Sequence, residues 1–249
     1  MSESSRRVGV PVFLPSDVVF DAKTHARADE LIARYPESRS ALLPLLHLVQ
    51  SVEGFVSQTG IEFCGAKLGL TDAEVSAVAT FYTMYKRTPC GEHLVSVCTN
   101  ALCAVLGGDA IYSALSRHLG VGHEQTSGEP NSPGSITLEH AECLAACDHA
   151  PVLQVDYEFY DHQTPDSALD LTMALQRGER PPPTRGAPLR DFRAAELEIA
   201  GIHPDLSAQI DVPTASDQTL RGARLAEQTG QRAPAMPEHL EFPPLPEKK

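Results

Sequence analysis

Four cysteines in two close pairs constrain this chain more than any other feature. Cys98 and Cys103 have four residues between them, and Cys143 and Cys147 have three. Two short loops that each give two thiolates are a simple way to supply the four sulfurs of a binuclear iron–sulfur cluster. The spacings differ from those of plant-type ferredoxins and from the C-x2-C pairs usual at zinc. The pattern therefore predicts a [2Fe–2S] site.

Composition narrows the class of protein. The formal net charge of −13 disfavours nucleic acid and anionic membrane surfaces as partners, because both are bound through an excess of Lys and Arg. The chain has no apolar run near the roughly 18 residues of a membrane span, and its N-terminus lacks the apolar core of a secretion signal. Six cysteines without an export signal indicate reduced thiols. We expect an acidic cytoplasmic protein with no nucleic acid partner and no direct membrane insertion.

Helical patterns follow a predicted extended arm at residues 1–22 and fill residues 23–88. Ser40–Gly54 is almost continuously apolar, with a proline near its start, where a helix tolerates it best. Thr71 and Glu74 have the spacing of a capping box at a helix N-terminus. We expect a small N-terminal helical bundle.

The pattern changes to alternating strands and helices over residues 89–180. Strands are predicted at His93–Cys98, Ser135–His140, Pro151–Asp156 and Tyr157–Tyr160, and helices at Asp109–Leu119 and Thr164–Gln176. This order is typical of a small thioredoxin-like sheet covered by helices, so the predicted fold class is α+β. Each cysteine pair lies at or just after the end of a strand. Strand ends at one edge of a sheet would bring the two loops together.

The last segment, residues 181–249, contains eleven of the chain's twenty prolines and few aromatic residues. A short helix is predicted near Asp191–Ala200. Such a segment cannot bury enough apolar surface to offset its ordering entropy by itself. We expect a Pro-rich tail that is extended or bound to a partner.

Other uses of the cysteines stay open at this point, namely unligated core thiols, structural zinc and two disulfides. Cys147 and His149 form a C-x-H typical of a Rieske centre, but no matching C-x-x-H exists, so His149 is expected beside the site or at the surface. Cys64 and Cys90 are expected to be core thiols. The sequence has no dinucleotide-binding glycine loop, P-loop, nucleophile elbow or H-E-x-x-H. The chain therefore lacks a complete catalytic site, and its expected role is one-electron transfer.

The residues around the cysteines resemble a known family over about residues 25–180. The matching motifs are FYTMY at 81–85, VCTNALC at 97–103, TLEHAECLAACDHAPVLQVD at 137–156 and YEFYDHQTP at 157–165. They resemble the E subunit of NADH–quinone oxidoreductase (respiratory complex I), a thioredoxin-like [2Fe–2S] ferredoxin family. The resemblance implies that Cys98, Cys103, Cys143 and Cys147 ligate one [2Fe–2S] cluster.

The resemblance also implies partners. FMN and NADH are expected on a partner flavin subunit and not on this chain, and the cluster would exchange single electrons with that FMN. A neighbouring iron–sulfur subunit of the peripheral arm is the second expected partner, in a complex on the cytoplasmic face of the inner (plasma) membrane. Ala145 stands where the family commonly has glycine, so a positive φ there would be strained. The Pro-rich tail exceeds the usual family length, and we expect it to wrap on a partner subunit.

Two further functions compete with this one. Similar subunits serve as diaphorase components of NAD-linked hydrogenases and NAD-dependent formate dehydrogenases, and the cluster motif does not separate them. From a different class, the chain could be a cluster-free thioredoxin-like scaffold that only docks other subunits. A thiol–disulfide oxidoreductase would need a C-x-x-C, which the sequence lacks.

Overall fold

The computed structural model describes residues 13–203 and 215–236. Its contacts divide the chain into two units, Met1–Thr214 and Ala215–Lys249. Of the predicted arm at 1–22, residues 1–12 lie outside the described part, as do residues 204–214 and 237–249 of the predicted tail. No helix in the described part is long and apolar enough to cross a membrane.

Four helices and a short 3-10 turn build the first part of the larger unit. They are α1 (Ala22–Ile32), η1 (Ser38–Ala41), α2 (Leu42–Glu53), α3 (Gln58–Leu68) and α4 (Asp72–Phe81). The predicted capping box is confirmed, since the Thr71 hydroxyl accepts from the Glu74 N–H and the Glu74 carboxylate accepts from the Thr71 N–H. The α1–α4 helices share one apolar core, and Phe13 and Phe20 of the N-terminal segment are buried in it.

The FYTMY segment splits between core and surface. Tyr85 is buried and its hydroxyl donates to the Leu43 carbonyl, whereas Phe81 at the end of α4 is 78% exposed. The segment therefore does not pack as one buried face, because Phe81 at its start points to solvent. Helical spacing shows which residues share a face, but the face ends where the chain leaves the helix at Tyr82.

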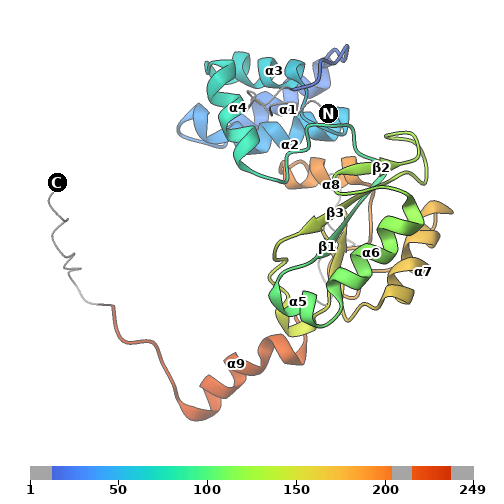
Figure 1. Cartoon of the computed structure of the whole chain (residues 1–249). Helices are drawn as coiled ribbons and strands as arrows, with labels where there is room; N and C mark the ends of the chain where they lie inside the picture. Colours follow the sequence, from blue (N-terminus) through green and yellow to red (C-terminus); the bar gives the residue numbers. More distant parts are fainter. Residues whose placement is uncertain (1–12, 204–214, 237–249) are drawn as a thin grey trace, which may run out of the picture. The chain divides into compact units, whose positions relative to one another are not determined.

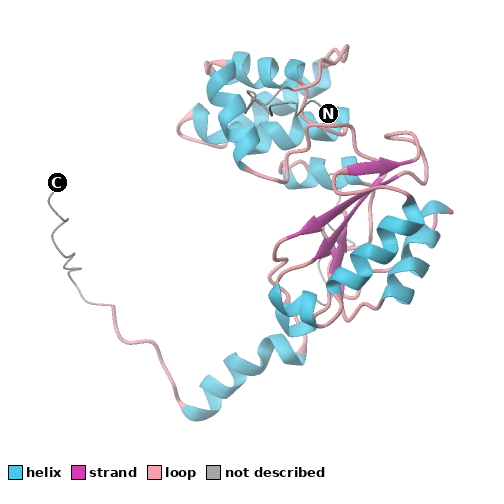
Figure 2. Ribbon diagram, viewed as in Figure 1, coloured by secondary structure: helices cyan, strands magenta, loops and turns pink. Residues whose placement is uncertain are grey.

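A five-stranded sheet forms the second part of the larger unit (Figures 1 and 2). Its strands are β1 (His93–Cys98), β2 (Gln125–Ser127), β3 (Ile136–Ala141), β4 (Leu153–Val155) and β5 (Glu158–Tyr160), in the order β2-β3-β1-β4-β5. β1 and β3 pair in parallel, and the other neighbours pair antiparallel. The predicted strand at His93–Cys98 is confirmed to the residue, whereas β2 was not predicted because three residues show no alternation.

Helices α6 (Gly108–Leu119) and α7 (Pro165–Gln176) pack side by side on one face of the sheet. Val95 and Val97 of β1 point into this layer, together with Ile111, Leu115 and Leu175 of the two helices. The alternate residues of β1 face the other side, where Leu94 meets a separate apolar cluster. A thioredoxin-like α/β layer results, with the short helix α5 (Ala101–Val105) directly after β1.

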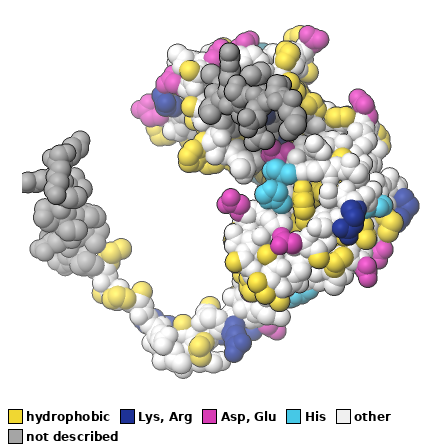
Figure 3. Space-filling view, in the orientation of Figure 1, with side chains coloured by type: hydrophobic (Ala, Val, Ile, Leu, Met, Phe, Trp, Pro, Cys, Tyr) yellow, Lys and Arg dark blue, Asp and Glu magenta, His cyan; other side chains and the backbone are white. Residues whose placement is uncertain are grey.

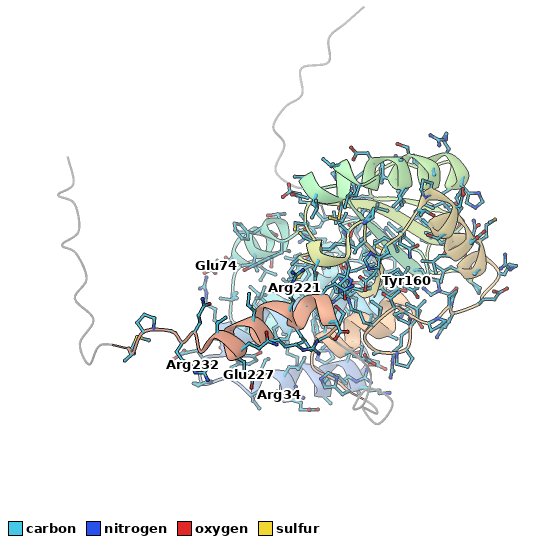
Figure 4. All side chains as sticks on the ribbon, turned by 90° about the horizontal axis from the view of Figure 1, so that it is seen from below. Arg34, Glu74, Tyr160, Arg221, Glu227 and Arg232 are labelled. Atoms are coloured by element: carbon cyan, nitrogen blue, oxygen red, sulfur yellow. The ribbon has the colours of Figure 1, made fainter. Side chains whose placement is uncertain are left out.

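The described residues after 180 contain more helix than the predicted tail. The predicted short helix is confirmed as α8 (Phe192–Ile199), capped by the Asp191 carboxylate. In the smaller unit, α9 (Asp217–Thr229) was not predicted, and none of its side chains is buried. Its Arg221 and Glu227 project from the helix, and Arg232 follows it (Figure 4).

Candidate iron–sulfur site

The parallel pairing of β1 and β3 brings the two cysteine loops to one edge of the sheet. Cys98 is the last residue of β1, and its register partner Ala141 is the last residue of β3. Cys143 therefore follows β3 by two residues, at the same edge that Cys98 occupies. Both strands run in the same direction, so their carboxyl ends coincide, and this places the two pairs side by side.

The first pair is held by a strand end and a short helix. Cys103 lies on α5, whose cap is Asn100, and the Asn100 side chain accepts a hydrogen bond from the Ala101 N–H. Gly107, with φ 115°, then turns the chain into α6. A Cβ on Gly108 would lie 2.4 Å from the Cys98 carbonyl oxygen, so only glycine lets α6 begin this close to the loop.

The two loops contact each other through apolar atoms. Cys98 and Cys103 are buried, and they share a small apolar cluster with Ala146 of the second loop and Val152 before β4. Cys143 and Cys147 are exposed. The inner half of the site is thus shielded from water, while the outer half lies at the surface.

Electrostatic interactions connect the thiols of the two loops. Cys103 interacts with Cys98, and Cys147 interacts with Cys143 in its own loop and with Cys98 in the other. Burial raises the pKa of Cys103 to about 11. The hydrogen bond with Cys143 is the largest cause that raises the pKa of Cys147. Without a metal, Cys103 and Cys147 therefore favour their protonated forms. A metal that binds here displaces those protons.

Backbone groups are also directed at the sulfurs. The Ala145 N–H donates to Cys143 Sγ at 3.4 Å, and a backbone hydrogen bond from Val152 lowers the pKa of Cys103 against the larger effect of burial. Cys98 Sγ donates to the Glu142 carbonyl at 3.6 Å. N–H donors of this kind favour negative charge on sulfur, which suits thiolates that hold an iron–sulfur core.

The donor set fits a binuclear cluster. Four cysteines in two pairs, each pair from one loop, match in number the two thiolates that each iron of a [2Fe–2S] centre takes. No group of three or more His, Cys, Asp or Glu side chains within residues 13–203 and 215–236 is arranged to hold a single metal ion. This geometry is compatible with the four cysteines as ligands. Their assignment as ligands stays a prediction.

Ala145 in the second loop has a left-handed backbone, with φ 56°. The expected strain at a non-glycine residue with positive φ is therefore present, and it amounts to about 1 kcal/mol. The same loop conformation directs the Ala145 N–H to Cys143, so the strain accompanies a contact that the site uses.

The remaining candidates lie outside the sulfur cluster. His149 is buried and not at the surface, with Nδ1 3.1 Å from His162 Nε2. Cys64 and Cys90 are buried core thiols, as predicted, and burial raises the pKa of both, that of Cys90 to about 12. Sequence reasoning missed Val152, whose carbonyl accepts the Cys98 N–H at 3.2 Å. No local signal reveals that contact, because it joins residues 54 positions apart.

A thioredoxin-like layer with two cysteine loops at one sheet edge defines a ferredoxin domain of the kind that carries electrons one at a time. A family model described as "Thioredoxin-like [2Fe-2S] ferredoxin" matches residues 28–176, and the chain belongs to this family. The sequence is 50% identical over 229 residues to the E subunit of an NADH-quinone oxidoreductase from Mycobacterium tuberculosis (strain ATCC 25618 / H37Rv). That alignment spans 92% of this chain and 88% of the relative.

More distant relatives carry related names. "NADH-quinone oxidoreductase subunit 2" of Thermus thermophilus is 34% identical over 155 residues, 61% of this chain and 83% of that protein. "NADH dehydrogenase [ubiquinone] flavoprotein 2, mitochondrial" of Dictyostelium discoideum is 32% identical over 180 residues, 71% of this chain and 70% of that protein. A solved NAD+-reducing [NiFe]-hydrogenase in the air-oxidised state aligns with TM-score 0.47 and 15% identity, over 54% of this chain and 23% of that one.

Proposed function

We propose that this chain is the [2Fe–2S] electron-transfer subunit of the NADH-oxidising module of an NADH–quinone oxidoreductase, with Cys98, Cys103, Cys143 and Cys147 as ligands. The observation that carries the proposal is the pairing of Cys98 with Ala141 at the shared end of two parallel strands. This pairing brings the two loops that carry the four thiols to one edge of the sheet, which supports the proposal. When bound, a [2Fe–2S] cluster supplies reversible one-electron transfer.

The chain's own residues would hold and shield that group. Cys98 and Cys103 give the inner thiolates, and the apolar contacts of Ala146 and Val152 keep water from them. Cys143 and Cys147 give the outer thiolates at the surface, where an electron donor can approach. The Ala145 N–H offsets part of the negative charge on the Cys143 sulfur.

Membership of the family supports a proposal about the partners and the location of the chain. We infer that FMN and NADH bind a partner flavin subunit, that a neighbouring iron–sulfur subunit completes the peripheral arm, and that the complex lies on the cytoplasmic face of the inner membrane. Within the chain, the proposed boundaries are a helical region at 23–88 and the ferredoxin domain at 89–180. Helix α9, in which no side chain is buried, supports docking of the last segment on a partner subunit. Equal protease cleavage after Arg221 in free and assembled protein would refute that docking.

Electron paramagnetic resonance of the anaerobically purified chain, before and after dithionite, tests the cluster. We expect a rhombic S = 1/2 signal on reduction, with about two irons and two acid-labile sulfides per chain. Zinc, or no metal, would exclude the proposal and leave a scaffold function. The co-purifying proteins then separate the enzymes: membrane-arm subunits with quinone reductase activity support the oxidoreductase, and a soluble hydrogenase or formate dehydrogenase supports the alternative.

Serine variants of the cysteines test the ligand set. Cys98→Ser and Cys143→Ser should each lose the signal and most of the iron. Cys64→Ala and Cys90→Ser are matched controls, because both thiols are buried in the cores and absent from the sulfur cluster. Loss of iron from the controls as well would indicate general unfolding and not removal of a ligand.

A further inference from the structure

Helix α8 lies between the α1–α4 helices and the sheet, although it comes from the segment expected to be a tail (Figure 1). α2 is its main helical neighbour. Ala200 is buried in the core of α1–α4, and Leu197 and Ile202 pack against that core. At the other end of α8, the fully buried Phe192 joins Cys90, Leu94 and Tyr157 on the sheet side. One eight-residue helix thus contributes apolar side chains to both halves of the larger unit, the α1–α4 helices and the ferredoxin sheet.

A buried carboxylate at the centre of α8 links the same two halves. Glu196 has no exposed surface. Its Oε2 is 2.6 Å from Nδ1 of His47 on α2, and its Oε1 accepts from the Tyr157 hydroxyl at 2.5 Å, in the turn between β4 and β5. Burying a carboxylate is costly unless it is paired and hydrogen-bonded, so this position fits only when both partners are in place.

Arg193 adds a second tie between α8 and α2. Its guanidinium donates to the carbonyls of Ser51 and Val52, at 3.0 Å and 2.5 Å. These are carbonyls of the last turn of α2, which has no basic residue of its own there. A cation at a helix C-terminus satisfies free carbonyls and interacts favourably with the helix dipole. The C-terminal segment therefore caps a helix about 140 residues earlier in the chain.

The two halves meet again at a groove beside the second cysteine loop. The groove has a volume of about 470 Å³ and is lined by residues that include Thr83 and Met84 from the connection after α4, and Cys143 and Leu144 from the loop. Tyr157 lines it as well, so the residue that holds Glu196 also forms a wall of this groove. The face drawn in Figure 3 carries histidine and acidic side chains close together.

We propose that residues 190–203 form an intramolecular clamp that fixes the α1–α4 helices against the ferredoxin domain, with Glu196 as its lock. The clamp sets the separation of the two groove walls beside Cys143. This inference goes beyond the electron-transfer role and does not depend on which metal the cysteines hold. If Cys98→Ser and Cys143→Ser kept the signal and the iron, the clamp would be unaffected.

Hydrogen–deuterium exchange of the full chain, followed by mass spectrometry, tests the clamp in Glu196→Ala. Exchange should rise at least about tenfold together in the C-terminal half of α2, in the β4–β5 turn and in residues 190–203, while the paired strands β1 and β3 stay protected. The groove walls at 83–86 and 142–146 should follow. Unchanged exchange in the walls would overturn the link to the groove.

Glu198→Gln is the matched control, because Glu198 lies on the same helix and pairs with Arg190 of the same segment. It should exchange like the wild type. Equal exchange in Glu196→Ala and the control would overturn the clamp, as would faster exchange in α8 alone with α2 unaffected. If Glu196→Ala fails to fold, two other variants replace it: Tyr157→Phe, which removes one hydroxyl, and Arg193→Gln. Hydrogen–deuterium exchange in the same peptides then tests the clamp.

Discussion

Gly108 lies against the backbone of Cys98 so closely that a Cβ would sit 2.4 Å from the Cys98 carbonyl oxygen and 2.9 Å from that of Cys103. Both atoms belong to the first cysteine loop. The start of α6 therefore packs directly on the backbone that positions the two inner thiols, and this contact leaves little room for an added side-chain atom.

Gly108→Ala should displace the first loop, because the added carbon meets backbone and not the end of a flexible side chain. We expect a loss of about 1–3 kcal/mol in stability and a reduced iron content. Gly222→Ala is the control, since a Cβ there meets no atom within 4 Å. Iron content and thermal midpoint of both variants check this, and an unaffected Gly108→Ala would contradict it.

Ala145→Gly should relieve the backbone strain at φ 56°. The gain in the folded state is about 1 kcal/mol, part of which is offset by the larger entropy of glycine in the unfolded chain. We expect a thermal midpoint equal to or a few degrees above the wild type. Ala146→Gly should lower the thermal midpoint. Ala146 has φ −116°, so glycine there removes a buried methyl group without relieving strain. The idea fails if both variants lose stability to the same extent.

Asp156 should make the stability of the sheet depend on pH. Its carboxyl is buried, pairs with Nδ1 of His93 at 2.5 Å and accepts from the Leu94 N–H at 2.8 Å. Burial raises its pKa from 3.8 to about 6. Because the folded-state pKa lies above the unfolded one, the carboxyl contributes stability below about pH 4 and loses it as the pH rises through 6.

Asp156→Asn should remove this dependence, since the amide does not titrate. Between pH 5 and 7.5 the wild type should lose about 1.4 kcal/mol relative to the variant, or about 3–6 °C in thermal midpoint. Thermal melts of both proteins across that range provide the measurement. Parallel pH profiles would show that Asp156 does not titrate there.

Lys86→Met should be destabilising, because Lys86 is a buried cation. Its ammonium pairs with the Glu139 carboxylate and donates to the Thr83 carbonyl at 2.9 Å. Removing it leaves a poorly solvated carboxylate on β3, at a cost of about 3 kcal/mol. The double variant Lys86→Met/Glu139→Gln should recover most of that loss in chemical unfolding.

Lys67→Met provides the control for that experiment. Lys67 pairs with Asp29, whose side chain is 66% exposed, so the loss should stay within about 1 kcal/mol. Similar losses in Lys86→Met and Lys67→Met would mean that burial of the first pair has little energetic consequence.

Local patterns sufficed for much of the secondary structure. The strand at His93–Cys98, the capping box of Thr71 and Glu74, and the helix capped by Asp191 were all predictable, because alternation and caps act within a few residues. The same holds for the pairing of the cysteines by spacing. The strained φ at Ala145 was expected from the residue that the family usually has there.

The sequence by itself determined which chemical groups are available: four thiols in two short loops, with each loop at the end of a strand, in an acidic chain. Tertiary structure alone decided that Phe81 faces outward, that Gly108 packs on Cys98, and that Glu196 is buried between His47 and Tyr157. These outcomes depend on contacts between residues far apart in the chain. The Pro-rich segment has too little apolar surface of its own to fold alone. Helix α8 is ordered because the α1–α4 helices and the sheet supply the remaining apolar contacts.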